Sequence, residues 1–168
     1  MTNTATRLFF AVVALQMAGL VVFAAVKQYA VATGTEVILQ GAPVDPRSLM
    51  QGDYAILDYE IAVVPEDMKT EFAVGDDVIV VLIKKDEVWE AIRYLNDDRV
   101  PKGNGEVFVR GRMQSNGRID FGIGTYFVPE GTGWEIERAQ DLKIRVSVND
   151  DGDATVTGVI VDGEDFSP

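Results

Sequence analysis

The side chains best suited to binding chemistry are three carboxylates and one guanidinium, which lie in two separate stretches of the chain. Asp45, Arg47 and Asp53 lie close together, and Glu130 stands between a proline and a glycine. Such groups pair with one another or hold a polar ligand through charge-assisted hydrogen bonds. All four are candidates for a partner- or ligand-binding site, provided that the fold brings them around one cleft.

The chain contains neither cysteine nor histidine, which narrows the possible chemistry. The absence of cysteine excludes thiol nucleophiles, disulfides and metal–thiolate centres. The absence of histidine removes the commonest general base near neutral pH and the commonest transition-metal ligand. We therefore predict no catalytic residues, no metal site and no cofactor.

A tyrosine-rich string follows the first group of charges. It reads Gly52-Asp53-Tyr54, two further residues, Leu57, one further residue and Tyr59. Strand alternation places Leu57 and Tyr59 on one face and the first tyrosine on the other. A turn that begins a core strand accounts for most of this string. We also consider four further residues as candidates for binding a partner or ligand. They are Gly52, Tyr54 and Tyr59 within the string, and the distant Tyr126.

The elements that must position these residues are mainly β-strands. Short alternating apolar runs separated by turn residues predict strands at 36–40, 54–63, 78–84, 88–95, 107–113, 118–121, 142–148 and 154–161. Residues 142–148 alternate cleanly, and residues 78–83 are apolar on both faces, which is typical of a central strand. We predict a mainly β domain, barrel- or sandwich-like, with one or two short helices, plus one N-terminal transmembrane helix.

Three local signals refine this prediction. Asn116-Gly117 predicts a hairpin with a type I′ turn. Residues 133–141 predict one short helix, capped by Thr132. Residues 65–72 predict a second, because proline suits the first helical turn.

The amino-terminal segment is long and apolar enough to cross a membrane. Residues 8–26 contain one polar side chain, Gln16, and an α-helix of this length spans about 28 Å. We expect a cytoplasmic head at 1–7, an anchor helix with an interfacial extension at 8–33, and an acidic β-rich extracytoplasmic domain at 34–168. The alternative is a cleaved signal peptide, although the apolar run is longer than is typical of one.

One side of this anchor carries small residues at a seven-residue spacing. Small residues let a second helix approach closely, and an amide hydrogen-bonds across such a contact. The alternative is that the small residues are ordinary anchor composition and the amide bonds locally. The candidate membrane helix contact consists of Ala11, Gln16, Ala18, Gly19 and Ala25.

Charge is distributed unevenly along the chain. The net charge is −12, and all 27 acidic residues lie at or beyond Glu36, whereas two of the 15 basic residues, Arg7 and Lys27, precede it. A domain this acidic is repelled by phosphate backbones, so we expect no nucleic-acid partner.

The string from Gly52 to Tyr59 closely resembles the signature of the bacterial membrane-anchored family named GDYXXLXY after it. The resemblance extends through residues 34–37, 43–47 and 126–131, and so over the full chain. It implies a single-pass protein of the bacterial cytoplasmic (inner) membrane whose C-terminal domain is periplasmic or extracytoplasmic. It also implies a multi-pass membrane protein as partner, in addition to the lipid bilayer, and it carries no activity with it.

A weaker similarity concerns type I signal peptidases. Residues 100–103 and 107–111 resemble parts of that scaffold, but the position of the nucleophilic serine holds Val44, and Arg112 replaces the expected aspartate. A serine–lysine mechanism also needs a lysine whose pKa is lowered by burial. The similarity therefore implies at most a related scaffold without the catalytic residues.

Three classes of function follow. The first is a non-enzymatic assembly or accessory subunit of a membrane protein complex. The second is a signal-peptidase-like membrane-bound hydrolase. The third is a module that binds a small ligand or the cell wall, which would be favoured only if Tyr126, Trp134 or Trp89 is exposed in a groove.

Overall fold

The computed structural model describes residues 2–42, 54–96, 103–128, 136 and 139–166. It divides the chain into two compact units, Met1–Thr33 and Gly34–Pro168. We describe each unit by itself.

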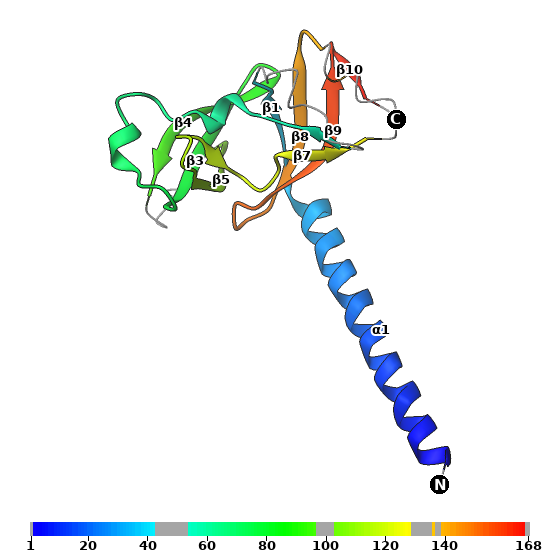
Figure 1. Ribbon diagram of the computed structural model, residues 1–168. Helices are drawn as coiled ribbons and strands as arrows, with labels where there is room; N and C mark the ends of the chain where they lie inside the picture. Colours follow the sequence, from blue (N-terminus) through cyan, green and yellow to red (C-terminus); the bar gives the residue numbers. More distant parts are fainter. Residues whose placement is uncertain (1, 43–53, 97–102, 129–135, 137–138, 167–168) are drawn as a thin grey trace. The chain divides into compact units, whose positions relative to one another are not determined.

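The first unit is one helix, α1 (Thr2–Thr33) (Figure 1). Its segment Thr6–Thr33 is long and apolar enough to cross a membrane, and its side chains are not buried against protein. The Thr33 hydroxyl donates a hydrogen bond to the Tyr29 carbonyl oxygen (2.8 Å) in the last turn. A helix that is apolar on all sides is stable only where its surface avoids water, and a membrane-spanning segment and a signal sequence both meet that condition.

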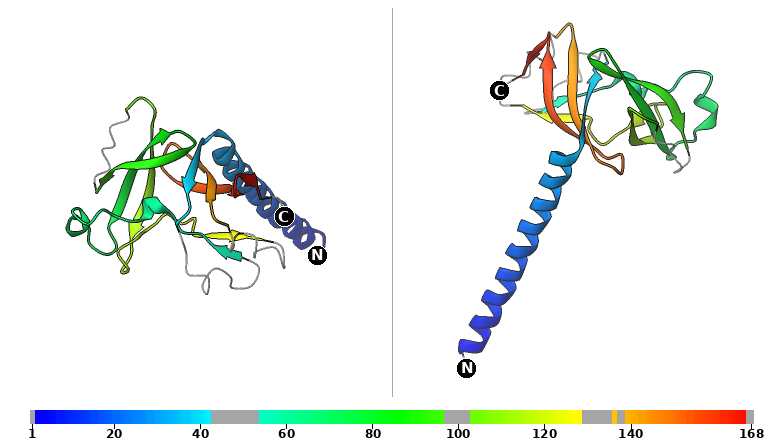
Figure 2. Two further views of the ribbon diagram at one scale, coloured as in Figure 1. Left: turned by 90° about the horizontal axis from the view of Figure 1, so that it is seen from above. Right: turned by 180° about the vertical axis from the view of Figure 1, so that it is seen from behind.

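The second unit is built from three antiparallel sheets (Figures 1 and 2). The first sheet has the order β1 (Thr35–Gln40), β8 (Leu142–Val148), β9 (Ala154–Val161) and β10 (Glu164–Asp165). The second has the order β4 (Val88–Leu95), β3 (Asp77–Lys85), β5 (Glu106–Met113) and β6 (Ile119–Asp120). The third is a ribbon of β2 (Tyr54–Ile56) and β7 (Thr125–Phe127). Two 3₁₀ turns, η1 (Glu60–Ala62) and η2 (Lys69–Glu71), lie between β2 and β3.

The core forms where the inner faces of these sheets meet. Leu39 and Ile144 from the first sheet and Val80, Leu82 and Val109 from the second are fully buried in one cluster. The central strand β3 is buried on both faces from Val78 to Leu82. The β-rich fold with one N-terminal apolar helix, and the central place of the 78–83 run, are thus confirmed.

Most of the predicted strands are present with nearly the predicted bounds. Those at 88–95, 142–148 and 154–161 have the same bounds as β4, β8 and β9. The prediction was wrong for 54–63, because β2 ends at Ile56 and the chain then turns through η1. The short strands β7 and β10 were not predicted, since two or three residues carry too little alternation to show a period.

The two predicted short helices have different outcomes. The predicted helix at 65–72 is a single 3₁₀ turn, η2, because the preceding residues form a hydrogen-bonded turn from the Met68 amide to the Pro65 carbonyl oxygen (3.0 Å). The helix predicted at 133–141 falls mostly outside the described residues.

The hairpin at Asn116-Gly117 exists, but its turn type was predicted wrongly. Gly117 has a positive φ of 77°, whereas Asn116 is not among the residues with positive φ. The Gly117 amide bonds the Gln114 carbonyl oxygen (3.0 Å) and the Gln114 amide bonds that of Arg118 (2.8 Å). This is a three-residue loop that ends in a left-handed glycine. Among the described residues, a turn with two consecutive positive φ values lies at Asp162 (50°) and Gly163 (90°), between β9 and β10.

Replacing Gly111 with alanine tests how closely β5 and β6 pack. A methyl group there would lie 2.4 Å from Ile119 Cγ2 and 2.9 Å from the Asp120 carbonyl oxygen. We expect Gly111→Ala to lower the free energy of unfolding by about 1–3 kcal/mol in chemical denaturation of the full chain. Gly124→Ala is the matched control, because its methyl group would meet only the Leu57 carbonyl oxygen at 3.7 Å. Equal effects of the two variants would contradict this packing.

Candidate functional site

The two segments that sequence analysis singled out pair with each other. Strand β2 carries the first tyrosine of the string and β7 carries Tyr126, and they align Tyr54 with Phe127 and Ala55 with Tyr126. A hydrogen bond from the Leu57 amide to the Gly124 carbonyl oxygen (2.9 Å) continues the pairing. Segments about seventy residues apart in sequence therefore form one ribbon.

Beyond β2 the string pairs with the other two sheets in turn. Tyr59 forms a bridge with Gly41, just after β1, and Val63 forms a bridge with Arg118, just before β6. The Ala42 amide also donates to the Asp58 carbonyl oxygen (3.0 Å). This segment, residues 54–63, is therefore the joint between all three sheets, and we call it the joint segment.

Tyr59 is the centre of the joint segment. Its side chain is 3% exposed, and its hydroxyl donates a 2.6 Å hydrogen bond to the Ile123 carbonyl oxygen. Its ring meets that of Phe121 edge-on, with centroids 6.5 Å apart. Burial raises the pKa of Tyr59 far above its usual range, and the charge of Asp58 raises it further, so the hydroxyl remains a donor. The side chain of Tyr59 thus lies in the core.

Asp58 and Arg118 form a second link at the joint segment. Arg118 Nη2 lies 2.5 Å from Asp58 Oδ1 and 3.1 Å from the Tyr59 carbonyl oxygen. The same Asp58 oxygen accepts the Tyr59 amide (2.8 Å). Sequence analysis missed this pair, since sixty residues separate its members and Asp58 occupies a spacer position of the string.

The predicted site residues fall into three groups. Tyr59 is buried, Tyr126 is half-buried on β7, and Tyr54 is placed by its backbone at the start of β2. The helix residues lie on the surface of α1, with open space around Gly19; they are Ala11, Gln16, Ala18, Gly19 and Ala25. Asp45, Arg47, Gly52, Asp53 and Glu130 lie outside the described residues.

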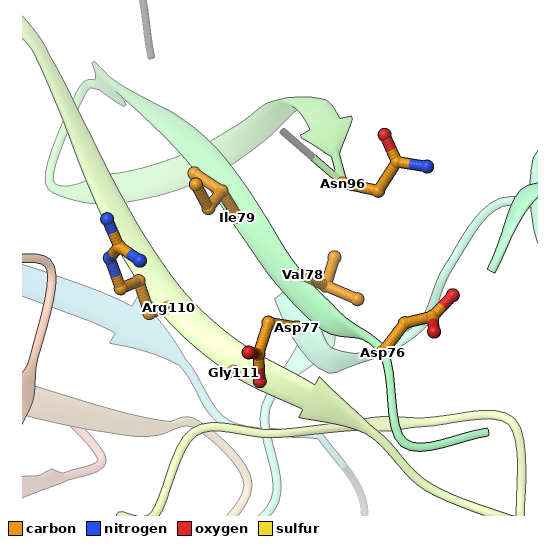
Figure 3. A pocket seen from close by; sticks show the side chains of 7 residues that line it. All are labelled: Asp76, Asp77, Val78, Ile79, Asn96, Arg110 and Gly111. Carbon is orange, nitrogen blue, oxygen red and sulfur yellow. The ribbon is translucent and has the colours of Figure 1, made fainter. Parts of the chain in front are cut away.

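One hollow on the second sheet does not form a convergent site. It measures about 760 Å³ and lies at the ends of β3 and β5 (Figure 3). Its charged groups are held by the scaffold: Asp77 pairs with Arg112 (3.0 Å), Asp76 accepts the Ala73 amide (2.8 Å), and Arg110 Nε donates to the Asp151 carbonyl oxygen (2.7 Å). In Figure 3 the side chains of Asp76, Arg110 and Asn96 stand apart from one another.

A second hollow, of about 540 Å³, has an aromatic wall. It lies between the end of β1, the turn η1 and strand β4, and we call it the seam pocket. The half-buried Trp89 packs partly against the core, and the Tyr94 hydroxyl donates to the Val63 carbonyl oxygen (3.2 Å). Burial raises the pKa of Tyr94. The residues that line the pocket are Gln40, Glu60, Ile61, Val88, Trp89, Glu90, Ala91 and Tyr94.

A third hollow, of about 410 Å³, lies between β7 and the start of β9. Tyr126 and the exposed Phe127 are among its lining residues. Of the three aromatic residues that would favour a binding module, Trp89 and Tyr126 therefore line hollows, and Trp134 lies outside the described residues.

Comparison with known proteins gives one match. A family model described as "GDYXXLXY protein" matches residues 16–159, which is most of the chain. No curated protein and no solved structure matches. The comparisons give no support to the similarity with type I signal peptidases.

Removing the buried hydroxyl tests the role of Tyr59. Tyr59→Phe leaves the Ile123 carbonyl oxygen without its partner, and we expect a loss of about 1–2 kcal/mol in the free energy of unfolding. Tyr126→Phe is the matched control, because that tyrosine side chain is half-buried on β7, the strand that pairs with the start of the joint segment. Thermal or chemical denaturation measures both. If both variants lose the same stability, the hydroxyl bond is not what sets Tyr59 apart.

Proposed function

The chain belongs to the GDYXXLXY protein family, and on this basis we propose that it is a single-pass, membrane-anchored envelope protein. Its β-rich domain acts as a non-enzymatic assembly or accessory subunit of a membrane protein complex. The observation that carries the proposal is that one chain of this family contains both an apolar helix long enough to cross a bilayer and a folded β-rich domain. In that domain the signature residue Tyr59 is hydrogen-bonded within the core.

The helix supports the membrane part of the proposal. Segment Thr6–Thr33 keeps its apolar side chains on the surface of α1, where water would be an unfavourable neighbour. Every acidic residue lies beyond it. We place the helix in the bacterial inner membrane, with residues 34–168 on the periplasmic side.

The chemistry of the joint segment supports a non-enzymatic role. The Tyr59 hydroxyl and the Asp58 carboxylate are bonded to the scaffold. The hydrolase alternative needs a lysine with a lowered pKa. Hydrogen bonds to Glu87 and Asp141 instead raise the pKa of Lys143, and Lys85 pairs with Glu90 at 3.0 Å.

The proposed partner is a multi-pass membrane protein, which meets the anchor in the bilayer and the domain outside it. Gln16 and Gly19 on α1 would contact it, because an amide and a small residue favour close helix packing.

A binding module is the second candidate function, and the seam pocket favours it. A half-buried tryptophan beside two carboxylates and an amide resembles a site built for a ligand rather than a core position.

The anchor is tested by fractionating cells that express the chain with an epitope at each end. We expect both epitopes to remain in the membrane fraction after an alkaline wash, because a spanning helix is not removed by salt or pH. A variant that lacks residues 2–33 should be released. Loss of the amino-terminal epitope from a released domain would identify a cleaved signal sequence instead.

Assembly is tested by affinity purification of the intact protein in mild detergent. We expect a multi-pass membrane protein to copurify in a fixed ratio. The double variant Gln16→Leu, Gly19→Leu should retain less of it, whereas Leu15→Ile, Leu20→Ile is the matched control within the same helix. A monomer without any partner would contradict the proposed function.

A further inference from the structure

The seam pocket exists because two edge strands face each other without pairing. Strand β1 pairs with β8 and strand β4 pairs with β3, and within the described part of the chain no ladder joins β1 to β4. An open edge is normally covered or blocked. Here the gap is lined by side chains from β1, η1 and β4.

A β-bulge turns Trp89 toward this gap. The register of β3 with β4 shifts between Val81, which aligns with Arg93, and Leu82, which aligns with Ala91, so Ile92 is the extra residue. Regular alternation from Tyr94 would place Glu90 on the inner face and Trp89 on the outer face. The bulge reverses this order. Trp89 and Ala91 pack against the core, and the Glu90 side chain is 49% exposed. Bulges commonly re-aim a side chain in this way.

The pocket wall offers negative charge and hydrogen-bond acceptors. Glu60 and Glu90 line it, and no lysine or arginine does so among the described residues. Glu90 is shared with Lys85, whereas the carboxylate of Glu60 has no ion pair in the described part of the chain. The Gln40 amide nitrogen donates to Asp141 Oδ1 (3.0 Å) and the Leu142 carbonyl oxygen (3.2 Å), so its oxygen is the atom left for a ligand.

We propose that the seam pocket binds an arginine side chain of the partner subunit. A guanidinium group is planar, stacks on an indole face and donates two hydrogen bonds to one carboxylate. Trp89 supplies the face, Glu60 the carboxylate and Gln40 a further acceptor. This inference rests on the proposed function for the source of the arginine, and the chemistry of the pocket is independent of it.

The direct test uses the full chain in detergent and N-acetyl-arginine amide as the probe. We expect the probe to shift the Trp89 indole NMR signal in a saturable way, while N-acetyl-citrulline amide, its neutral analogue, does not. Glu60→Gln should weaken binding about fivefold. Trp89→Leu and Trp89→Phe lack the indole reporter, so their binding is read from saturation transfer to the probe's own NMR signals, and by this readout Trp89→Leu should abolish it. Glu164→Gln, at an exposed carboxylate on β10, is the matched control and should bind as the wild type does. Trp89→Phe, which keeps an aromatic ring, assigns the signal and retains part of the affinity.

Three results would overturn the proposal. They are the absence of a shift with the arginine probe, an equal shift with citrulline, and a shift with chitobiose alone, which would identify a carbohydrate site.

Copurification separates this inference from the proposed function. If the wild type, Glu60→Gln and Trp89→Leu retain equal amounts of partner, the pocket inference fails and assembly stands. If the wild type retains no partner, assembly fails and the arginine titration decides the pocket alone.

Discussion

The fold depends on a short segment that belongs to three sheets in turn. Residues 54–63 begin paired with β7, touch the end of β1 at Tyr59, and finish beside β6 at Val63. A segment that changes partners so often forms few ladder hydrogen bonds of its own, and each unpaired buried polar group would cost stability. The Tyr59 hydroxyl and the Arg118 guanidinium compensate by bonding the backbone carbonyl oxygens of Ile123 and Tyr59.

This arrangement gives the family signature a physical meaning. The glycine and aspartate of the string lie outside the described residues, but its leucine and second tyrosine are buried, and its first tyrosine begins the ribbon with β7. The second tyrosine needs both a large apolar ring and a polar tip, because it fills the core beside Phe121 and still reaches a carbonyl oxygen. Phenylalanine supplies only the ring. A signature of this kind marks the place where the sheets are joined.

Local patterns predicted much of the fold, and long-range pairings account for what they missed. The alternation at 142–148 and the doubly apolar run at 78–83 predicted β8 and β3, because Ile144, Val146 and Val148 are buried on β8 and the run from Val78 to Leu82 is buried on both faces of β3. From Ala55 to Ile61 every second residue is buried, so the predicted shared face of Leu57 and Tyr59 was correct, although the ladder ended at Ile56 and the alternation stops at the buried Ala62. The turn at Asn116-Gly117 was mistyped, since the dipeptide suits both a type I′ turn and a three-residue loop with a left-handed glycine. The seam pocket was not predictable, because it depends on the bulge at Ile92 and on the approach of β4 to the end of β1.

The bulge in β4 has an evolutionary consequence. Because one extra residue decides which of two neighbours, Trp89 or Glu90, faces inward, a β4 of the same length that paired with β3 without the bulge would place the Glu90 carboxylate where the indole now lies, whereas deletion of Ile92 itself would make the strand regular and keep Trp89 inward. The pairing of β3 with β5 lies on the opposite edge of β3 and would keep its register. Proteins with the same scaffold can therefore differ in what their seam accepts through the pairing register of this one strand, without any change in the rest of the fold.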